Sequence, residues 1–244
     1  MLAFLTACSS SGHRTYNVST HKVRKGETLY SIAWRYNLDY KKVARWNGIG
    51  QPYRIHAGQE LWLSPRSTSK STSTKKSTST STKYPRSTSN TQAKTKPSTA
   101  TTTQKKQSKS SYSDKTAYPS GKLKWQWPAS GKVIKSYSTS NQGKKGIDIA
   151  GKRGQPVLAA AAGKVVYGGV GLKGYGKLVI IKHNNNFFSA YAHNNKILAK
   201  EGSWVKRGQK IAEMGNTDAE RNMLHFEIRR NGNPVNPMSY LPKR

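Results

Sequence analysis

Residues 144–154 read KKGIDIAGKRG, and they belong to a part of the chain where glycines and turns separate short apolar runs. Each run is apolar or alternating and is bounded by Gly, Asn or Pro, and no long helical periodicity interrupts the series. The runs occupy residues 131–138, 156–169, 176–184, 187–193, 203–215 and 224–232. This pattern predicts a mainly antiparallel, all-β domain over residues 123–244.

The order of these segments resembles a known enzyme family. The segments that carry this resemblance are GIDIA (146–150), GYGKLVIIKH (174–183), YAH (191–193), VKRGQKIAEMG (205–215) and LHFEIR (224–229). With these segments the chain is similar to the LytM-like (lysostaphin-type, peptidase M23-type) zinc endopeptidases, which cleave peptide cross-links in peptidoglycan. The resemblance implies the fold of these peptidases for residues 123–244.

The metal-site residues of that family are only partly retained. Its zinc ligands are the His and Asp of His-x-x-x-Asp and the second His of His-x-His, which fall on Lys144, Asp148 and His225. The first His of His-x-His, which is catalytic, falls on Met223. The other catalytic histidine falls on His193. By resemblance, one of three ligands and one of two catalytic histidines are lost.

These losses remove the chemistry of the reaction. A hydrolytic zinc site needs three protein ligands and an open position. A protonated lysine offers no lone pair, and a methionine cannot donate a hydrogen bond to an oxyanion. We therefore expect no cofactor and no catalysis. In the alternative, His193 or His183 joins Asp148 and His225 in a rearranged zinc site, and the chain is an active murein endopeptidase.

The sequence pattern of residues 21–64 predicts a separate α+β module with the element order β-α-α-β. Thr28 is a candidate helix N-cap before apolar residues at helical spacing, and Asp39 or Tyr40 opens a second helix that Asn47-Gly48 ends. An alternating strand, with Leu61 and Leu63 on one face, closes the module.

This module resembles a LysM domain. The resemblance rests on Gly26-Glu27-Thr28-Leu29, Ile32-Ala33, Asn47 and Gly58-Gln59-Glu60-Leu61, with Glu27 in place of the commoner Asp. It implies binding to the glycan strands of peptidoglycan, which contain N-acetylglucosamine. By analogy, the glycan-binding residues are Gly26, Glu27, Thr28, Leu29, Asn47, Ile49 and Tyr53.

The charge of the chain is strongly one-sided, with 43 Lys and Arg against 10 Asp and Glu and a formal net charge of +33. Such a balance favours a polyanionic partner. Residues 65–122 are rich in Ser, Thr and Lys and are expected to form a disordered linker, because they cannot bury enough apolar surface. The expected anions are those of the cell envelope and not nucleic acid, because the LysM resemblance and a lipobox-like sequence near the N-terminus both indicate the envelope.

The N-terminal sequence FLTACSSS places Cys8 in a setting that resembles a bacterial lipobox. Residues 1–8 would then be the remnant of a lipoprotein signal and residues 9–20 a tether, with Cys8 as the lipidation site. Only seven residues precede Cys8, so either the start shown lies inside the true signal or Cys8 is an ordinary terminal residue. Ser9 after the cysteine implies, by resemblance, retention in the outer membrane.

The combined layout resembles the NlpD family of outer-membrane lipoproteins. That resemblance implies a catalytically inactive protein that faces the periplasm, is enriched at the division septum, and activates a periplasmic N-acetylmuramoyl-L-alanine amidase. The expected partner groove comprises Lys144, Asp148, Tyr191, His193 and His225. A structural tether between the wall and the membrane remains a further alternative.

Overall fold

The computed structural model of the chain describes residues 19–65, 118, 121–139 and 145–244. Several predicted features lie outside these residues: the signal remnant 1–8 with Cys8, nearly all of the tether 9–20, nearly all of the linker 65–122, and Lys144. Neither of the α-helices in the described part has the length and apolar character needed to cross a bilayer.

The N-terminal module has the predicted β-α-α-β order. Its elements are β1 (Thr20–Lys22), α1 (Leu29–Arg35), α2 (Tyr40–Trp46) and β2 (Glu60–Trp62). The two strands pair antiparallel, with Thr20 opposite Trp62. Leu61 and Leu63 are buried and Glu60 is exposed, which confirms the predicted alternation of the closing strand.

Side-chain caps set the helix starts in this module. Ser31 donates its backbone N–H to the Thr28 hydroxyl (3.1 Å), and Thr28 donates its own N–H to the Ser31 hydroxyl (3.0 Å), forming a capping box. Asp39 accepts from the backbone N–H of Lys41 at 2.8 Å and so caps α2. Both caps satisfy amides that the first helical turn leaves without partners.

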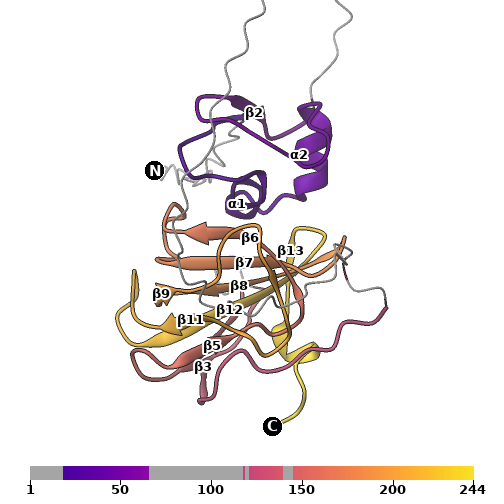
Figure 1. Cartoon of the computed structure of the whole chain (residues 1–244). Helices are drawn as coiled ribbons and strands as arrows, with labels where there is room; N and C mark the ends of the chain where they lie inside the picture. Colours follow the sequence, from indigo (N-terminus) through magenta and orange to yellow (C-terminus); the bar gives the residue numbers. More distant parts are fainter. Residues whose placement is uncertain (1–18, 66–117, 119–120, 140–144) are drawn as a thin grey trace, which may run out of the picture. The chain divides into compact units, whose positions relative to one another are not determined.

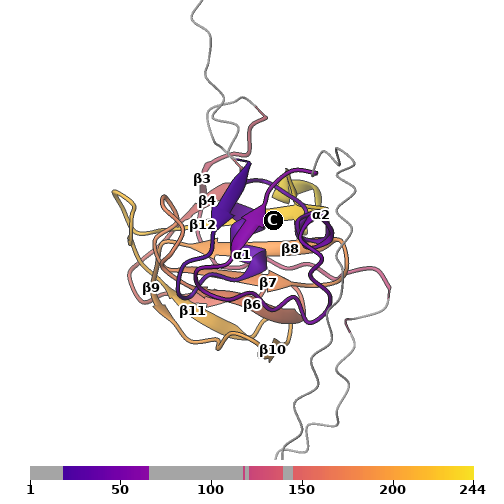
Figure 2. The same cartoon turned by 90° about the horizontal axis from the view of Figure 1, so that it is seen from above.

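The C-terminal domain consists of antiparallel β-strands in two sheets (Figures 1 and 2). The larger sheet has the order β10-β6-β7-β8-β12-β4-β3, with β13 also paired to β12, and the smaller has the order β5-β11-β9. The strands are β3 (Val133–Lys135), β4 (Ile147–Ala150), β5 (Pro156–Leu158), β6 (Gly163–Gly169), β7 (Leu178–Lys182), β8 (Phe187–Ala192), β9 (Asn194–Ile197), β10 (Trp204–Val205), β11 (Lys210–Met214), β12 (Met223–Arg230) and β13 (Asn233–Val235). The mainly antiparallel prediction is confirmed.

Apolar side chains between the two sheets form the core of this domain. Strand β12 contributes Leu224, Phe226 and Ile228, which are fully buried at alternate positions. Successive strand residues point to opposite faces of a sheet. The intervening residues of β12 therefore lie on the face of the sheet away from this core.

A buried polar chain crosses the core beside these apolar residues. The backbone N–H of Ala160 donates to the Tyr191 hydroxyl (2.8 Å), which lies 2.9 Å from the Ser189 hydroxyl. Ser189 Oγ lies 2.7 Å from His183 Nε2, and His183 Nδ1 lies 2.8 Å from the Ala162 carbonyl oxygen. A carbonyl oxygen can only accept, so Nδ1 carries the proton and Nε2 accepts from Ser189. The neutral imidazole thus fits the whole chain.

This chain predicts an acid sensitivity of the fold. Burial lowers the pKa of His183 to about 4, against about 6.5 in the unfolded chain. Between these values the unfolded state binds more protons, so stability is fully present above pH 6.5 and falls as the pH drops toward 4, by up to about 3 kcal/mol. Urea unfolding at a series of pH values measures this loss.

His183→Gln should flatten this part of the pH profile. His56→Gln, at an exposed histidine, is the matched control and should keep the profile of the unaltered chain. If His183→Gln and the unaltered chain lose stability in parallel on acidification, the assignment of acid sensitivity to His183 is wrong.

Candidate functional site

The pairing of β4 with β12 brings the retained site residues together. His225 lies directly opposite Asp148 across these two strands. Ile147 and Ile149 of β4 are buried in the core, as are Leu224 and Phe226 of β12. The alternation of both strands therefore places Asp148 and His225 on the other face.

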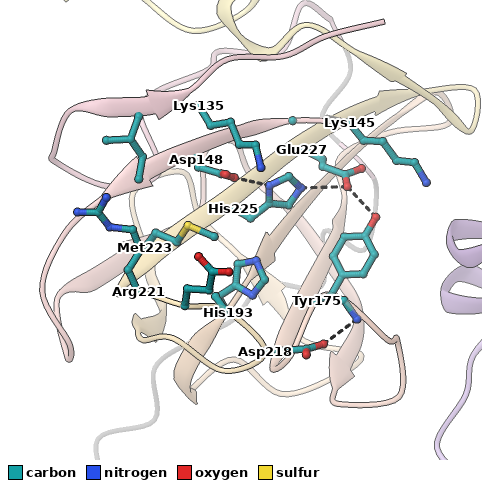
Figure 3. Close-up of a pocket in the computed structure, with 15 residues that line it drawn as sticks. Lys135, Lys145, Asp148, Tyr175, His193, Asp218, Arg221, Met223, His225 and Glu227 are labelled. Carbon is teal, nitrogen blue, oxygen red and sulfur yellow. Dashed lines mark hydrogen bonds and ion pairs between the residues drawn. The ribbon is translucent and has the colours of Figure 1, made fainter. Parts of the chain in front are cut away.

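On that face lies an open cavity of about 610 Å³ (Figure 3). Strands β3, β4 and β12 contribute to it, together with the loops on either side of them. Its lining residues are Ile134, Lys135, Lys145, Gly146, Asp148, Gly174, Tyr175, His193, Asp218, Ala219, Glu220, Arg221, Met223, His225 and Glu227.

His225 is held between two carboxylates. Its Nδ1 lies 2.6 Å from Asp148 Oδ1, and its Nε2 lies 3.2 Å from Glu227 Oε1. Burial alone would lower the pKa of His225, but the hydrogen bonds to Asp148 and Glu227 outweigh burial and raise this pKa to about 9. In the metal-free site both ring nitrogens therefore carry protons at neutral pH.

Glu227 organises the floor of the cavity. Its side chain is fully buried; Oε1 accepts from the Tyr175 hydroxyl at 2.7 Å and Oε2 accepts from Arg229 Nε at 2.9 Å. Burial alone would raise the pKa of Glu227, but the charges of Arg229 and His225 lower it to about 2. This carboxylate therefore stays ionised and fixes both the His225 ring and the Tyr175 side chain.

His193 reaches the cavity through an unusual backbone conformation. Strand β8 ends at Ala192, and His193 follows with φ of 63°, in the left-handed region that few residues other than glycine adopt. Its N–H donates to the Tyr175 carbonyl (2.9 Å) and its Nδ1 to the Thr217 carbonyl (2.8 Å). Burial lowers the pKa of His193, so its ring stays neutral with the Nε2 lone pair free of these bonds.

The described residues do not fit a zinc ion. Asp148 and His225 share a hydrogen bond, and nearby Met223 is a thioether rather than an imidazole. Within residues 145–244 and the other described stretches, no group of three or more His, Cys, Asp or Glu side chains could hold a metal. The alternative site with His183 also fails on geometry, because both its ring nitrogens are engaged in the core.

The structure brings three residues of the predicted partner groove together and excludes a fourth from their cavity. Asp148, His193 and His225 line one cavity. Tyr191 does not, so its assignment to the groove is wrong: it is fully buried, opposite Phe226. Sequence reasoning also missed Lys135, Lys145, Tyr175, Asp218, Glu220 and Arg221, and did not place Glu227 in the groove. Only Glu227 carried a usable signal, since it lies two residues after His225 on an alternating strand.

The predicted glycan-binding residues divide into exposed and structural positions. Gly26 is exposed, and Ile49 and Tyr53 are partly exposed. Leu29 is fully buried in the core of the module, so its side chain is unavailable to a glycan. The Asn47 side chain is engaged by strand β2, donating to the Trp62 carbonyl (2.8 Å) and accepting from the Trp62 N–H (2.7 Å).

Two further predicted glycan-binding residues, Glu27 and Thr28, also use their side chains inside the module. Glu27 pairs with His21 Nε2 and with Arg35 Nη2, each at 2.7 Å. Thr28 caps α1 through its hydroxyl. Any glycan contact at these two positions would therefore involve mainly the backbone of the loop before α1.

Comparison with known proteins places both modules in described families. Residues 21–64 match the LysM domain, and residues 142–237 match peptidase family M23. The LysM match includes all the predicted glycan-binding residues, and the M23 match includes Asp148, His193 and His225.

The chain is also similar to several lipoproteins over most of its length. The chain is 49% identical over 229 residues to the lipoprotein NlpD/LppB homolog of Pseudomonas aeruginosa, covering 91% of this chain and 76% of that protein. It is 44% identical over 243 residues to the uncharacterized lipoprotein YgeR of Escherichia coli K12, covering 99% and 88%. It is 39% identical over 265 residues to the murein hydrolase activator NlpD of Escherichia coli K12, covering 94% and 69%.

The cavity chemistry predicts how metal binding could be restored. Lys144→His should supply a third ligand beside Asp148 and His225, and the variant should bind about one equivalent of zinc, because three ligands suffice for a hydrolytic site. Equilibrium dialysis followed by metal analysis measures this. Murein endopeptidase activity should require Met223→His in addition, since the second catalytic histidine would otherwise still be missing.

Lys152→His, at an exposed position outside the cavity, controls for adventitious binding by a new histidine. The unaltered chain and Lys152→His should bind no stoichiometric zinc. One equivalent in the unaltered chain would contradict the conclusion that these residues do not fit the metal.

The same geometry predicts the effect of neutralising Glu227. Glu227→Gln removes a negative charge beside His225, so the pKa of His225 should fall from about 9 toward lower values, because the imidazolium loses an ionic partner. NMR titration of the histidine ring nitrogens measures the shift. Asp218→Asn is the control, because the Asp218 carboxylate accepts from the Gly174 N–H rather than from His225. If the pKa of His225 fell equally in Asp218→Asn, the shift would not depend on a specific contact with Glu227.

Proposed function

Because the chain belongs to the NlpD family of lipoproteins, we propose that it is a cell-envelope lipoprotein that binds peptidoglycan and activates an N-acetylmuramoyl-L-alanine amidase without hydrolysing murein itself. The observation that carries this proposal is the contrast within the cavity. The peptidase face is present with Asp148, His193 and His225, yet Lys144 and Met223 stand where the resembling peptidases have a ligand histidine and a catalytic histidine.

The residue types at the site argue against hydrolysis by this chain. Zinc activates water by lowering the pKa of that water toward neutrality. Here a protonated Lys144 offers no lone pair to a metal, and Met223 cannot donate a hydrogen bond to an oxyanion. A neutral His193 alone lacks both an activated nucleophile and a partner for oxyanion stabilisation. The cavity therefore supports binding better than it supports chemistry.

Activation follows from binding energy that depends on the partner's conformation. A protein can shift an autoinhibited enzyme toward its active state only if it binds the active state more tightly. Tenfold tighter binding of the active state shifts that equilibrium by about tenfold. In this proposal the cavity supplies the selective contact, and the LysM module holds the chain at peptidoglycan.

The proposal also includes a location in the cell envelope. Lipidation at Cys8 would anchor the chain in the outer membrane facing the periplasm, and glycan binding would concentrate it where the amidase acts during division, at the septum. The strongly basic sequence also suits the anionic surfaces of the envelope.

We predict that the purified full chain accelerates at least one periplasmic amidase by about tenfold or more, and releases nothing from murein alone. The assay is release of labelled fragments from sacculi by each amidase with and without the chain. The assay is repeated with a zinc chelator. A control amidase that needs no activator is treated in the same way, and its loss of activity shows how much inhibition comes from removal of the amidase's own metal.

A pair of matched variants ties the effect to the cavity. Ile134 lines the cavity and is 40% exposed, whereas Val170 is 69% exposed and lies outside it. Ile134→Glu should abolish most of the acceleration and Val170→Glu should preserve it, with both variants folded. If no periplasmic amidase responds to the unaltered chain, the activator proposal is wrong and a structural tether becomes the better account.

A further inference from the structure

The carboxylates of the cavity are mostly committed to partners within the domain. Asp148 binds His225, Glu227 binds His225, Tyr175 and Arg229, and Asp218 accepts from the backbone N–H of Gly174 at 2.7 Å. Among these lining acids, Glu220 alone has no such partner in the described residues.

The cations of the cavity are free of such partners. Lys135, Lys145 and Arg221 line the cavity, and their side chains form no ion pair with any residue of the described stretches. Lys145 is also partly buried, and burial together with the charge of Arg229 lowers the pKa of Lys145 more than the charge of nearby Glu227 raises it. A partly buried, unpaired charge is costly and favours a partner that supplies the opposite charge.

The three cations are spread along the cavity rather than gathered at one point. Figure 3 shows Lys145 and Arg221 at opposite ends, with Lys135 between them beside Asp148 and His225. A small anion at one end of the cavity would not reach the cation at the other end. A chain segment with several carboxylates could pair with all three at once.

The apolar lining adds a second requirement. Ile134 is 40% exposed on the same wall as Lys135, and Met223 lines the cavity from β12. An apolar side chain placed against them would remove their surface from water, which provides binding energy without direction. The cations would then set the register of the segment.

We infer that the amidase segment that docks in this cavity is acidic, with carboxylates that pair with Lys135, Lys145 and Arg221 around an apolar residue that contacts Ile134 and Met223. This inference rests on the proposed function and specifies the chemistry of its partner. Peptidoglycan stem peptides also carry carboxylates, but they are short, and the apolar contact favours a protein segment.

The test is charge reversal in the full chain. Lys135→Glu, Lys145→Glu and Arg221→Glu are compared with Lys152→Glu, an exposed lysine outside the cavity. The readouts are affinity for an amidase that the unaltered chain stimulates, and retention on amidase-free murein. Each cavity reversal should weaken amidase affinity by about tenfold at low salt and by less at high salt, because exposed charges are screened. Lys152→Glu should leave affinity unchanged.

The outcomes separate this inference from the proposed function. If the unaltered chain stimulates an amidase but the cavity reversals bind it as well as Lys152→Glu does, the inference is wrong while the proposed function stands. Tighter binding after reversal would indicate a basic segment and would also overturn the inference. Reversals that weaken retention on murein but not amidase affinity would assign the cavity to stem peptides instead. Absence of any stimulation by the unaltered chain would overturn both.

Discussion

The hydrogen bond between His225 and Asp148 is the interaction on which the character of the cavity depends. It exists because β4 and β12 pair in a register that sets these two residues opposite each other. The same geometry would suit two ligands converging on a metal. In this chain a proton lies between them, and Glu227 holds the other side of the ring.

Glu227 extends this effect beyond the ion pair. One of its oxygens holds both the imidazole of His225 and the hydroxyl of Tyr175, and the other holds Arg229. A buried carboxylate in water-poor surroundings is stable only when its bonds are satisfied. Here the satisfied network fixes the positions of His225, Tyr175 and Arg229 relative to one another.

Much of the fold follows from local signals in the sequence. Thr28 and Asp39 indicated the starts of the two helices, because their side chains cap backbone amides. Such a cap depends only on a few neighbouring residues. The order of strands in the large sheet did not follow from such signals. Pairs such as β12 with β4 join residues far apart in the sequence, and no local pattern specifies them.

The error at Tyr191 has a specific physical cause. Tyr191 and His193 are two residues apart, so an uninterrupted strand would place both on one face. Strand β8 ends between them, and the positive φ at His193 turns its side chain into the cavity while Tyr191 stays in the core. Lys135, Lys145 and Arg221 were missed for another reason: they come from separate segments, and only the folded sheet brings them to one opening.

The alternation along β12 also limits how this protein can change. Leu224, Phe226 and Ile228 supply the core, while Met223, His225 and Glu227 line the cavity. Deleting or inserting one residue in the strand would exchange the two sets, burying charges and exposing the core. A substitution at a single position does not change which residues of β12 face the core and which face the cavity. A strand of this kind can therefore lose or regain a chemistry one side chain at a time while the shape that a partner recognises persists.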